Sequence, residues 1–160
     1  MDSLLQLLKQ NSRFSDKQLA SMLGTTEEDI AKQIKEYEKN GVIMGYSVIL
    51  NEDLIDDSEV TAFIDLKVTP QKDCGFDHIA EKIMMYDRVE SVTLMSGAYD
   101  LSVTVTGADL KTIALFVAKE LSTIEGVKST STHFVLKRYK EKGIFIDKKN
   151  KNDERRMISP

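Results

Sequence analysis

The stretch Ser96-Gly97-Ala98-Tyr99-Asp100 places one carboxylate close to a glycine and other small residues. A free amino acid presents an ammonium and a carboxylate, so a site for it needs one fixed anion and a few neutral donors. Asp100 could accept from the ammonium, and backbone N–H groups around Gly97 and Ala98, where no bulky side chain blocks approach, could hold the carboxylate. The alternative is that Gly97 makes a turn and Asp100 caps it locally. The residues alone leave both interpretations open.

Few other residues have the chemistry for catalysis or metal binding. The two histidines, His78 and His133, lie in different predicted elements, and Cys74 is the only cysteine. Cys74 and His78 share one acidic stretch, but C-x-x-x-H is not a recognised zinc spacing and has no second half. The sequence also lacks a Walker loop, a dinucleotide loop and a Gly-x-Ser-x-Gly motif. We therefore predict that the protein is not an enzyme and that it binds no metal and no cofactor.

The elements that must position the 96–100 stretch begin at residue 60. Apolar residues alternate from Val60 to Val68, which predicts a strand with one buried face. A helical stripe follows from Phe76 to Ile83, then two strands over 89–95 and 100–107 joined by a hairpin at 96–99. A second helical stripe covers 110–121, and a last strand is predicted over 126–139. The order β-α-β-β-α-β predicts a split βαβ, or ferredoxin-like, domain.

Three short helices are predicted in the first 42 residues. Ser15 and Gln18 form an S-x-x-Q capping box, and Gly24 suits the sharp turn of a helix-turn-helix because it takes positive φ at low cost. The third helix begins at Thr25 or Thr26, and its apolar residues recur at i, i+4 and i+7. These residues are Ile30, Ile34 and Tyr37.

Residues 43–58 are predicted to link the two domains. The linker covers most of a β-segment (VIMGYSVIL, residues 42–50) and of an acidic loop (NEDLIDDSE, residues 51–59). The tail, residues 139–160, is highly charged and poor in apolar residues, which predicts a solvated basic extension. Two alternatives stay open for the tail. It could be an arm that touches DNA phosphates, or a strand added to a neighbouring subunit.

The net charge of −4 is unevenly spread. Residues 51–136 carry 7 basic and 15 acidic groups, whereas residues 137–160 carry 9 and 4. Charge alone therefore neither supports nor excludes DNA binding. A hydrophobic content of 41% with 30% charged residues is typical of a soluble globular protein. Because there is neither an apolar run of ~20 residues nor a signal-peptide pattern, we expect a cytoplasmic protein without a membrane anchor.

Taken together, these elements resemble the Lrp/AsnC, or feast/famine, family of transcriptional regulators over roughly residues 1–140. Four motifs in the right order carry the resemblance: NSRFSDKQLASMLGTTEEDI, YEKNGVIMGY, SGAYDL and EGVKSTSTHFVLKRYK. It implies an α+β protein with an N-terminal winged-type helix-turn-helix (1–42) and a C-terminal ferredoxin-like βαββαβ domain (RAM, ACT-like; 59–138).

The resemblance also implies partners. Family members pair through the sheets of their C-terminal domains, and the dimers assemble into larger discs, often octamers. A free amino acid or related metabolite binds between dimers and shifts assembly or DNA affinity. We therefore expect a homodimer that assembles into a larger oligomer and that binds double-stranded DNA and such an effector.

Site residues follow from the match to the family's Gly-x-Tyr-Asp motif and to threonines in its last strand. The expected effector-binding residues are Ser96, Gly97, Ala98, Tyr99, Asp100, Thr130 and Thr132. For DNA, the candidates for base edges are Thr26, Asp29 and Gln33, and those for phosphates are Lys32, Lys35 and Lys39, with Thr25 at the start of the helix.

The chain departs from the family pattern in a shorter start, a longer tail and an acidic first turn of the recognition helix. Gln33 stands where family members usually carry arginine. The acids of the first turn, Glu27, Glu28 and Asp29, suit the positive end of a helix dipole and a capping box with Thr25 or Thr26. Two alternative functions stay open: a metabolite-binding oligomer with little DNA affinity that acts through a protein partner, and a chromatin-like DNA organiser.

Overall fold

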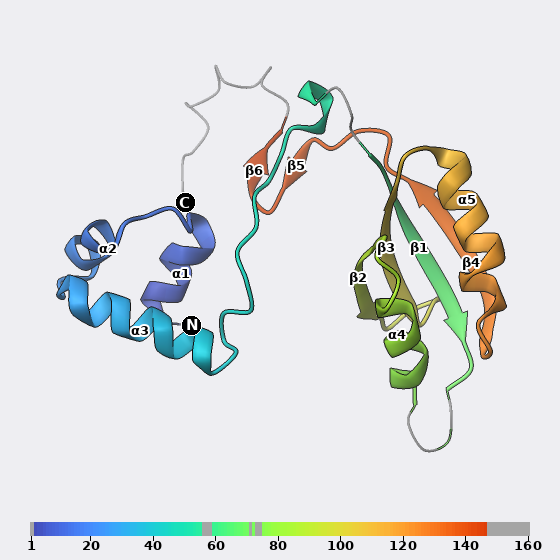
Figure 1. Ribbon diagram of the computed structural model, residues 1–160, viewed down its shortest axis with the longest axis horizontal. Coiled ribbons are helices and arrows are strands. Elements are labelled where there is room, and N and C mark those ends of the chain that lie inside the picture. Colours follow the sequence, from blue (N-terminus) through green and yellow to red (C-terminus); the bar gives the residue numbers. More distant parts are fainter. Residues whose placement is uncertain (1, 56–58, 71, 73–74, 147–160) are drawn as a thin grey trace. The chain divides into compact units, whose positions relative to one another are not determined.

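The computed structural model describes residues 2–55, 59–70, 72 and 75–146 (Figure 1). The chain divides into two units, residues 1–49 and residues 50–160. The division falls inside the predicted 43–58 linker. Residues 56–58 of the predicted acidic loop and residues 147–160 of the predicted extension lie outside the described residues.

The first unit contains three helices, α1 (Ser3–Gln10), α2 (Asp16–Leu23) and α3 (Glu27–Lys39). Its core consists of Leu4, Leu19, Ala20 and Ile30, one cluster to which all three helices contribute. The predicted apolar stripe of the third helix is confirmed, because Ile34 and Tyr37 pack against this cluster beside Ile30.

Local hydrogen bonds fix the boundaries of α2 as the sequence predicts. The Gln18 backbone N–H donates to Ser15 Oγ (3.2 Å), and the Ser15 backbone N–H donates to Gln18 Oε1 (2.9 Å), which completes the capping box. Gly24 ends the helix in the left-handed conformation, with φ of 67°. A side chain at this position would be strained, so the sharp turn before α3 favours glycine.

Residues 44–50 form no strand, contrary to the predicted β-segment. Alternate apolar side chains are exposed along this stretch, including Met44 at 88% and Val48 at 76%. A strand requires a neighbouring strand to take up its backbone hydrogen bonds. The alternating pattern indicates that residues 44–50 can pair with another strand, but the single chain has no strand beside them.

The second unit is built on a four-stranded sheet with the order β2-β3-β1-β4. Its strands are β1 (Val60–Val68), β2 (Val89–Leu94), β3 (Leu101–Gly107) and β4 (Val127–Phe134), and all three pairings are antiparallel. Helices α4 (Asp77–Met84) and α5 (Leu110–Lys119) are the two crossovers of the predicted β-α-β-β-α-β order (Figure 1). Short 3₁₀ turns, η1 (Glu52–Leu54) and η2 (Leu121–Thr123), precede β1 and β4.

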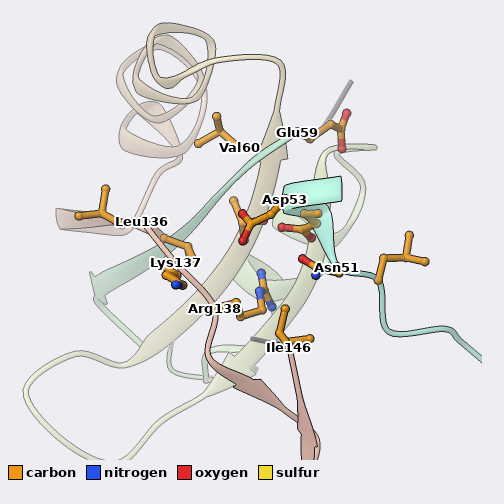
Figure 2. A pocket seen from close by; sticks show the side chains of 12 residues that line it. Asn51, Asp53, Glu59, Val60, Leu136, Lys137, Arg138 and Ile146 are labelled. Carbon is orange, nitrogen blue, oxygen red and sulfur yellow. The ribbon is translucent and has the colours of Figure 1, made fainter. Parts of the chain in front are cut away.

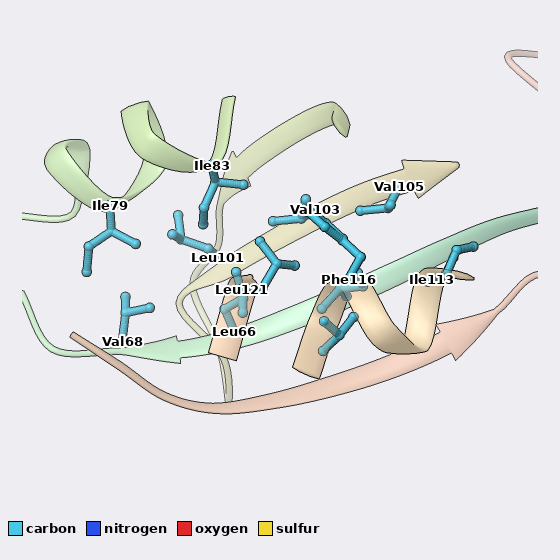
Figure 3. Packing of buried hydrophobic residues seen from close by; sticks show 13 residues of the cluster. Leu66, Val68, Ile79, Ile83, Leu101, Val103, Val105, Ile113, Phe116 and Leu121 are labelled. Atoms are coloured by element: carbon cyan, nitrogen blue, oxygen red, sulfur yellow. The ribbon is translucent and has the colours of Figure 1, made fainter. Parts of the chain in front are cut away.

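Strand alternation places one face of the sheet against the helices. The strand residues on this face are fully buried: Ile64, Leu66, Leu101 and Val103. They pack against apolar side chains of the two helices, Ile79 and Ile83 of α4 and Ile113 and Phe116 of α5 (Figure 3). The prediction that Ile79 and Ile83 cover the sheet is confirmed. The opposite face, here called the open face, is rich in hydroxyls. Its members include Ser91, Thr93, Ser102, Thr104, Thr106, Ser129 and Ser131, around the half-exposed ring of Phe63.

The chain beyond β4 is partly ordered. β4 ends at Phe134, earlier than the predicted 139, and a second hairpin pairs β5 (Lys140–Glu141) with β6 (Ile144–Phe145). Its two turn residues, Lys142 and Gly143, have φ of 44° and 90°, the signs that a tight two-residue hairpin turn requires. Ile146 is buried at the end of this hairpin. Residues 139–146 therefore form a hairpin, and the prediction of a solvated extension was wrong for this part of the tail.

Candidate effector site and nucleic-acid interface

The 96–99 loop projects from the end of the sheet where β2 turns into β3. The Met95 N–H donates to the Asp100 carbonyl (2.8 Å), and the Asp100 N–H donates to the Leu66 carbonyl (2.9 Å). Ser96, Gly97 and Ala98 are exposed, and Tyr99 is half-buried. The predicted hairpin is confirmed, and the candidate residues 96–100 lie together at one end of the sheet.

Both oxygens of the Asp100 carboxylate accept hydrogen bonds within the chain. Lys67 Nζ donates to Oδ1 (2.9 Å), and the Val68 backbone N–H donates to Oδ2 (2.9 Å). The Val68 N–H, followed by Lys67, lowers the pKa of Asp100 below its usual value. The local structural role that the sequence left open for Asp100 is therefore present. An ammonium would have to share these oxygens, which is possible because each carries more than one lone pair.

Gly97 is not required by the backbone of the turn. Its φ lies outside the left-handed region, and a Cβ built there would meet no heavy atom within 4 Å. Among the described residues, none of the backbone N–H groups from Ser96 to Tyr99 donates to a carbonyl. Backbone N–H groups that donate to no carbonyl, beside a glycine with open space, are suited to an anion such as a carboxylate.

Thr130 and Thr132 reach the same sheet from the far strand. Thr130 pairs with Leu66 and Thr132 with Ile64, so both half-buried side chains lie on the helix-covered face. Leu66 also pairs with Leu101 of β3, so Thr130 belongs to the row of residues nearest the hairpin. Thr132 lies one pair further into the sheet. The topology thus brings Thr130, more than Thr132, toward the 96–100 end.

The acidic first turn of α3 is held by its own threonines. Thr26 is the N-cap residue, and its Oγ1 accepts from the Asp29 N–H (3.2 Å). The hydroxyls of Thr26 (2.7 Å) and Thr25 (3.2 Å) both donate to Asp29 Oδ2. These bonds, that from Thr26 first, lower the pKa of Asp29 below its usual value. Three predicted DNA-contacting residues therefore form one local network that stabilises the helix start.

The Gln33 side chain is turned toward the start of α1. Its Nε2 donates to the Tyr37 hydroxyl (2.7 Å) and to Asp2 Oδ2 (3.3 Å). Asp2 also caps α1 by accepting from the Leu4 N–H (2.8 Å). Because both N–H donors of the amide are engaged, a base contact through either of them would require one of these bonds to break.

The three lysines of α3 share one exposed face. Lys32, Lys35 and Lys39 follow at intervals of three and four residues, which places them on one side of the helix. This side lies opposite the buried Ile30. Glu28 precedes Lys32 by four residues and stands on the same side, where it offsets part of their positive charge.

Sequence reasoning did not identify Lys67 as a partner of Asp100. Lys67 occupies a polar position in the alternation of β1, and its contact depends on β1 and β3 being neighbours, which no local pattern reveals.

Of the acidic stretch around Cys74 and His78, Asp73 and Cys74 lie outside the described residues. In the part of the chain that the structure describes, no cluster of three or more His, Cys, Asp or Glu residues could hold a metal ion. Nor is any helix of that part long and apolar enough to span a membrane.

Comparisons with known proteins agree with this architecture. The chain is 42% identical over 158 residues to the uncharacterised HTH-type transcriptional regulator YugG of Bacillus subtilis, covering 98% of this chain and 95% of YugG. It is 25% identical over 143 residues to the leucine-responsive regulatory protein of Haemophilus influenzae, covering 89% and 86% of the two chains.

Solved structures share the fold. E. coli AsnC matches with a TM-score of 0.64 and 24% identity over 86% of this chain and 93% of AsnC. A transcriptional regulator of Neisseria meningitidis, solved as a complex with L-Met, matches with a TM-score of 0.69 and 23% identity over 88% and 93% of the two chains. Residues 61–145 match the family model described as the Lrp/AsnC ligand binding domain. The predicted fold class is confirmed, and the chain belongs to the Lrp/AsnC family of HTH-type transcriptional regulators.

Proposed function

We propose that this regulator binds double-stranded DNA through α3 and responds to a free amino acid, or a related small metabolite, held at the 96–100 hairpin. The observation that supports the effector site most directly is Gly97. Neither strain nor crowding within the chain requires glycine there. A glycine in open space beside unpaired N–H groups is explained if a ligand carboxylate approaches the backbone closely.

The roles within this site follow from the contacts of each group. The N–H groups of residues 96–99 would hold the carboxylate, with Lys67 as the nearest cation because it is already bound to Asp100. Asp100 would accept from the ammonium as a shared partner. Thr130 and Thr132 lie on the helix-covered face, opposite to Lys67, so within one chain neither hydroxyl completes the lining of this site.

A thermal-shift screen of the twenty amino acids tests the effector site, because a ligand that binds only the folded state raises the melting temperature. Gly97→Val should abolish the shift given by the best amino acid without lowering the stability of the free protein. Ala108→Val is the control, since Ala108 is also exposed and follows β3 at the end of the sheet away from the hairpin. An unchanged shift in Gly97→Val would remove the hairpin from the effector site.

For DNA, Lys32, Lys35 and Lys39 are the proposed phosphate contacts, with Thr25, Thr26, Asp29 and Gln33 near the bases. Because three of these near-base residues are tied into the helix cap, we expect phosphate contacts to dominate the affinity. Glu28→Lys should tighten DNA binding and steepen the dependence of log K on log salt by about 0.9 per added phosphate contact.

Glu27→Lys makes the same change of charge away from the lysine face and is the matched control. Gel mobility shifts at several salt concentrations measure both variants on the upstream region of the protein's own gene. Equal slopes for the two variants would show that the lysine face does not meet the phosphates.

We further propose a homodimer that assembles into a larger oligomer, up to an octamer. Two surfaces support self-association: the exposed alternating side chains Met44, Tyr46, Val48 and Leu50, and the open face of the sheet. A second copy of residues 44–50 would supply the missing strand neighbour. A dimer would place two α3 helices on half-sites about one DNA turn, or a multiple, apart.

The acidic turn of α3 favours a second candidate function, an effector-binding oligomer that acts through a protein partner. Absence of a mobility shift below micromolar protein at ~100 mM salt, with and without amino acids, would favour it over DNA binding. Long periodic footprints in place of discrete half-sites would instead indicate a DNA organiser.

A further inference from the structure

A small pocket lies at the end of the sheet away from the 96–100 hairpin. It is formed where the residues before and within η1, the start of β1 and the segment after β4 come together, all within the second unit (Figure 2). Its volume is about 170 Å³, roughly ten times the ~10–15 Å³ that one water molecule needs. The backbone bond from the Val135 N–H to the Thr61 carbonyl (2.9 Å) fixes two of its walls.

Asn51 presents an unpaired acceptor in this pocket. It occupies the N-cap position of η1, where asparagine normally accepts from the backbone of the turn, yet its side chain makes no capping bond. Its Oδ1 is instead buried and has no hydrogen-bond partner among the described residues. Figure 2 shows the side chain turned toward the space that Arg138 also enters.

Arg138 presents an unpaired donor in the same pocket. Its Nη1 donates to Glu141 Oε2 (3.2 Å), whereas its Nε is buried without a partner among the described residues. Arginine does not deprotonate in proteins, so this N–H remains a donor at every accessible pH. Burying a polar group without a partner costs roughly 1–3 kcal/mol, and such groups call for an explanation.

The surroundings determine which ligand chemistry suits the two groups. Among the described residues that line the pocket, three are carboxylates, Glu52, Asp53 and Glu59, and two are cations, Lys137 and Arg138. The wall includes the apolar Val60 and the buried Ile146. A ligand that is only an anion would face the excess of carboxylates, and one that is only a cation would leave the Arg138 N–H unpaired.

We propose that this pocket binds a small zwitterion of the α-amino-acid class, separately from the hairpin. The ligand carboxylate accepts from the Arg138 Nε–H. The ligand ammonium donates to Asn51 Oδ1 and is further favoured by the three carboxylates of the lining. Such a ligand satisfies both unpaired groups at once, which water molecules do less favourably because each would have to be immobilised.

Isothermal titration calorimetry of the full-length Gly97→Val protein tests this proposal with the twenty amino acids, in a background where the hairpin is blocked. Propionate and propylamine serve as probes that carry one charge each. At least one amino acid should bind once per chain, more tightly than either probe. Arg138→Met and Asn51→Leu in that background should each weaken binding at least tenfold. Arg13→Met, which removes an exposed cation from the first unit, should leave it unchanged.

Three results would overturn the proposal. These are no binding by any of the twenty amino acids, equal binding by propionate, or unchanged affinity in both Arg138→Met and Asn51→Leu. Circular dichroism of both variants establishes that lost binding does not reflect unfolding. The test does not depend on the hairpin site. If Gly97→Val fails to block effector binding, the proposed hairpin site is wrong, but Arg138→Met and Asn51→Leu still show whether the pocket binds an amino acid.

Discussion

The two polar clusters at opposite ends of the sheet differ in whether their hydrogen bonds are made. At the hairpin end, both oxygens of Asp100 are paired with Lys67 and Val68. At the pocket end, Asn51 Oδ1 and Arg138 Nε are buried and unpaired among the described residues. Paired groups stabilise the folded chain by themselves, whereas unpaired groups destabilise it until a ligand or water satisfies them. Removing a paired group should therefore destabilise the chain, whereas removing an unpaired group should change its stability little.

The largest effect should come from Gly126→Ala in the turn before β4, at the hairpin end. Gly126 has φ of 96°, and an added Cβ would lie 2.8 Å from Ile79 Cδ1. Left-handed strain and overpacking together should cost about 2–5 kcal/mol. Gly97→Ala, on the same end of the sheet but in open space, should change the free energy of unfolding by less than about 0.5 kcal/mol. Urea unfolding of both variants measures the difference, and equal losses would contradict this distinction between the two glycines.

Asp100→Ala should lower the melting temperature clearly, because it leaves Lys67 and the Val68 N–H without their partner. Asp100→Asn, which keeps one acceptor oxygen, should lower it less. The pKa of Asp100 is lower in the folded chain than in the unfolded one. Its stabilisation is therefore fully present above the unfolded pKa of about 3.9 and is lost as pH falls through the folded pKa.

The difference in melting temperature between the parent chain and Asp100→Asn should accordingly be large at pH 6 and shrink as pH falls below about 4. A difference that stays constant over this range would show that the charge of Asp100 does not stabilise the hairpin end.

Thr26→Ala extends the comparison to a paired cluster in the first unit. The variant removes the N-cap of α3 and one of the two hydroxyls that donate to Asp29. Loss of an N-cap costs about 0.5–2 kcal/mol. Thr26→Ser, which keeps the hydroxyl, should restore most of this stability in urea unfolding, and failure to do so would assign the loss to the methyl group.

The smallest effect should come from Arg138→Met at the pocket end. This change removes the unpaired Nε–H together with the partly buried ion pair with Glu141. The two contributions oppose each other, so the free energy of unfolding without ligand should change by less than about 1 kcal/mol. A loss of several kcal/mol in ligand-free protein would show that the guanidinium is paired in solution, and the contrast between the two ends would disappear.

The sequence predicted those parts of the fold that depend on neighbouring residues. Strand alternation from Val60 to Val68, the Ser15–Gln18 capping box and the turn at Gly24 each follow from a period or a local hydrogen bond. Contacts between residues distant in sequence could not be predicted in the same way. Lys67 meets Asp100 only because β1 lies beside β3, and Gln33 meets Asp2 only because α3 packs near the start of α1. The β-segment predicted over 42–50 forms no strand in the single chain, because its pattern indicates pairing without supplying the partner strand.

The hydroxyl-rich open face has a consequence for the proposed dimer, if the two sheets pair through it. An interface built on Ser and Thr side chains, with the single half-exposed Phe63 and the Asp65–His133 pair (3.4 Å) within it, is polar and admits water. Such a face would supply little hydrophobic driving force. In the proposed dimer, the exposed apolar side chains Met44, Tyr46, Val48 and Leu50 would therefore supply most of the affinity, and the open face would mainly fix how the two sheets are aligned.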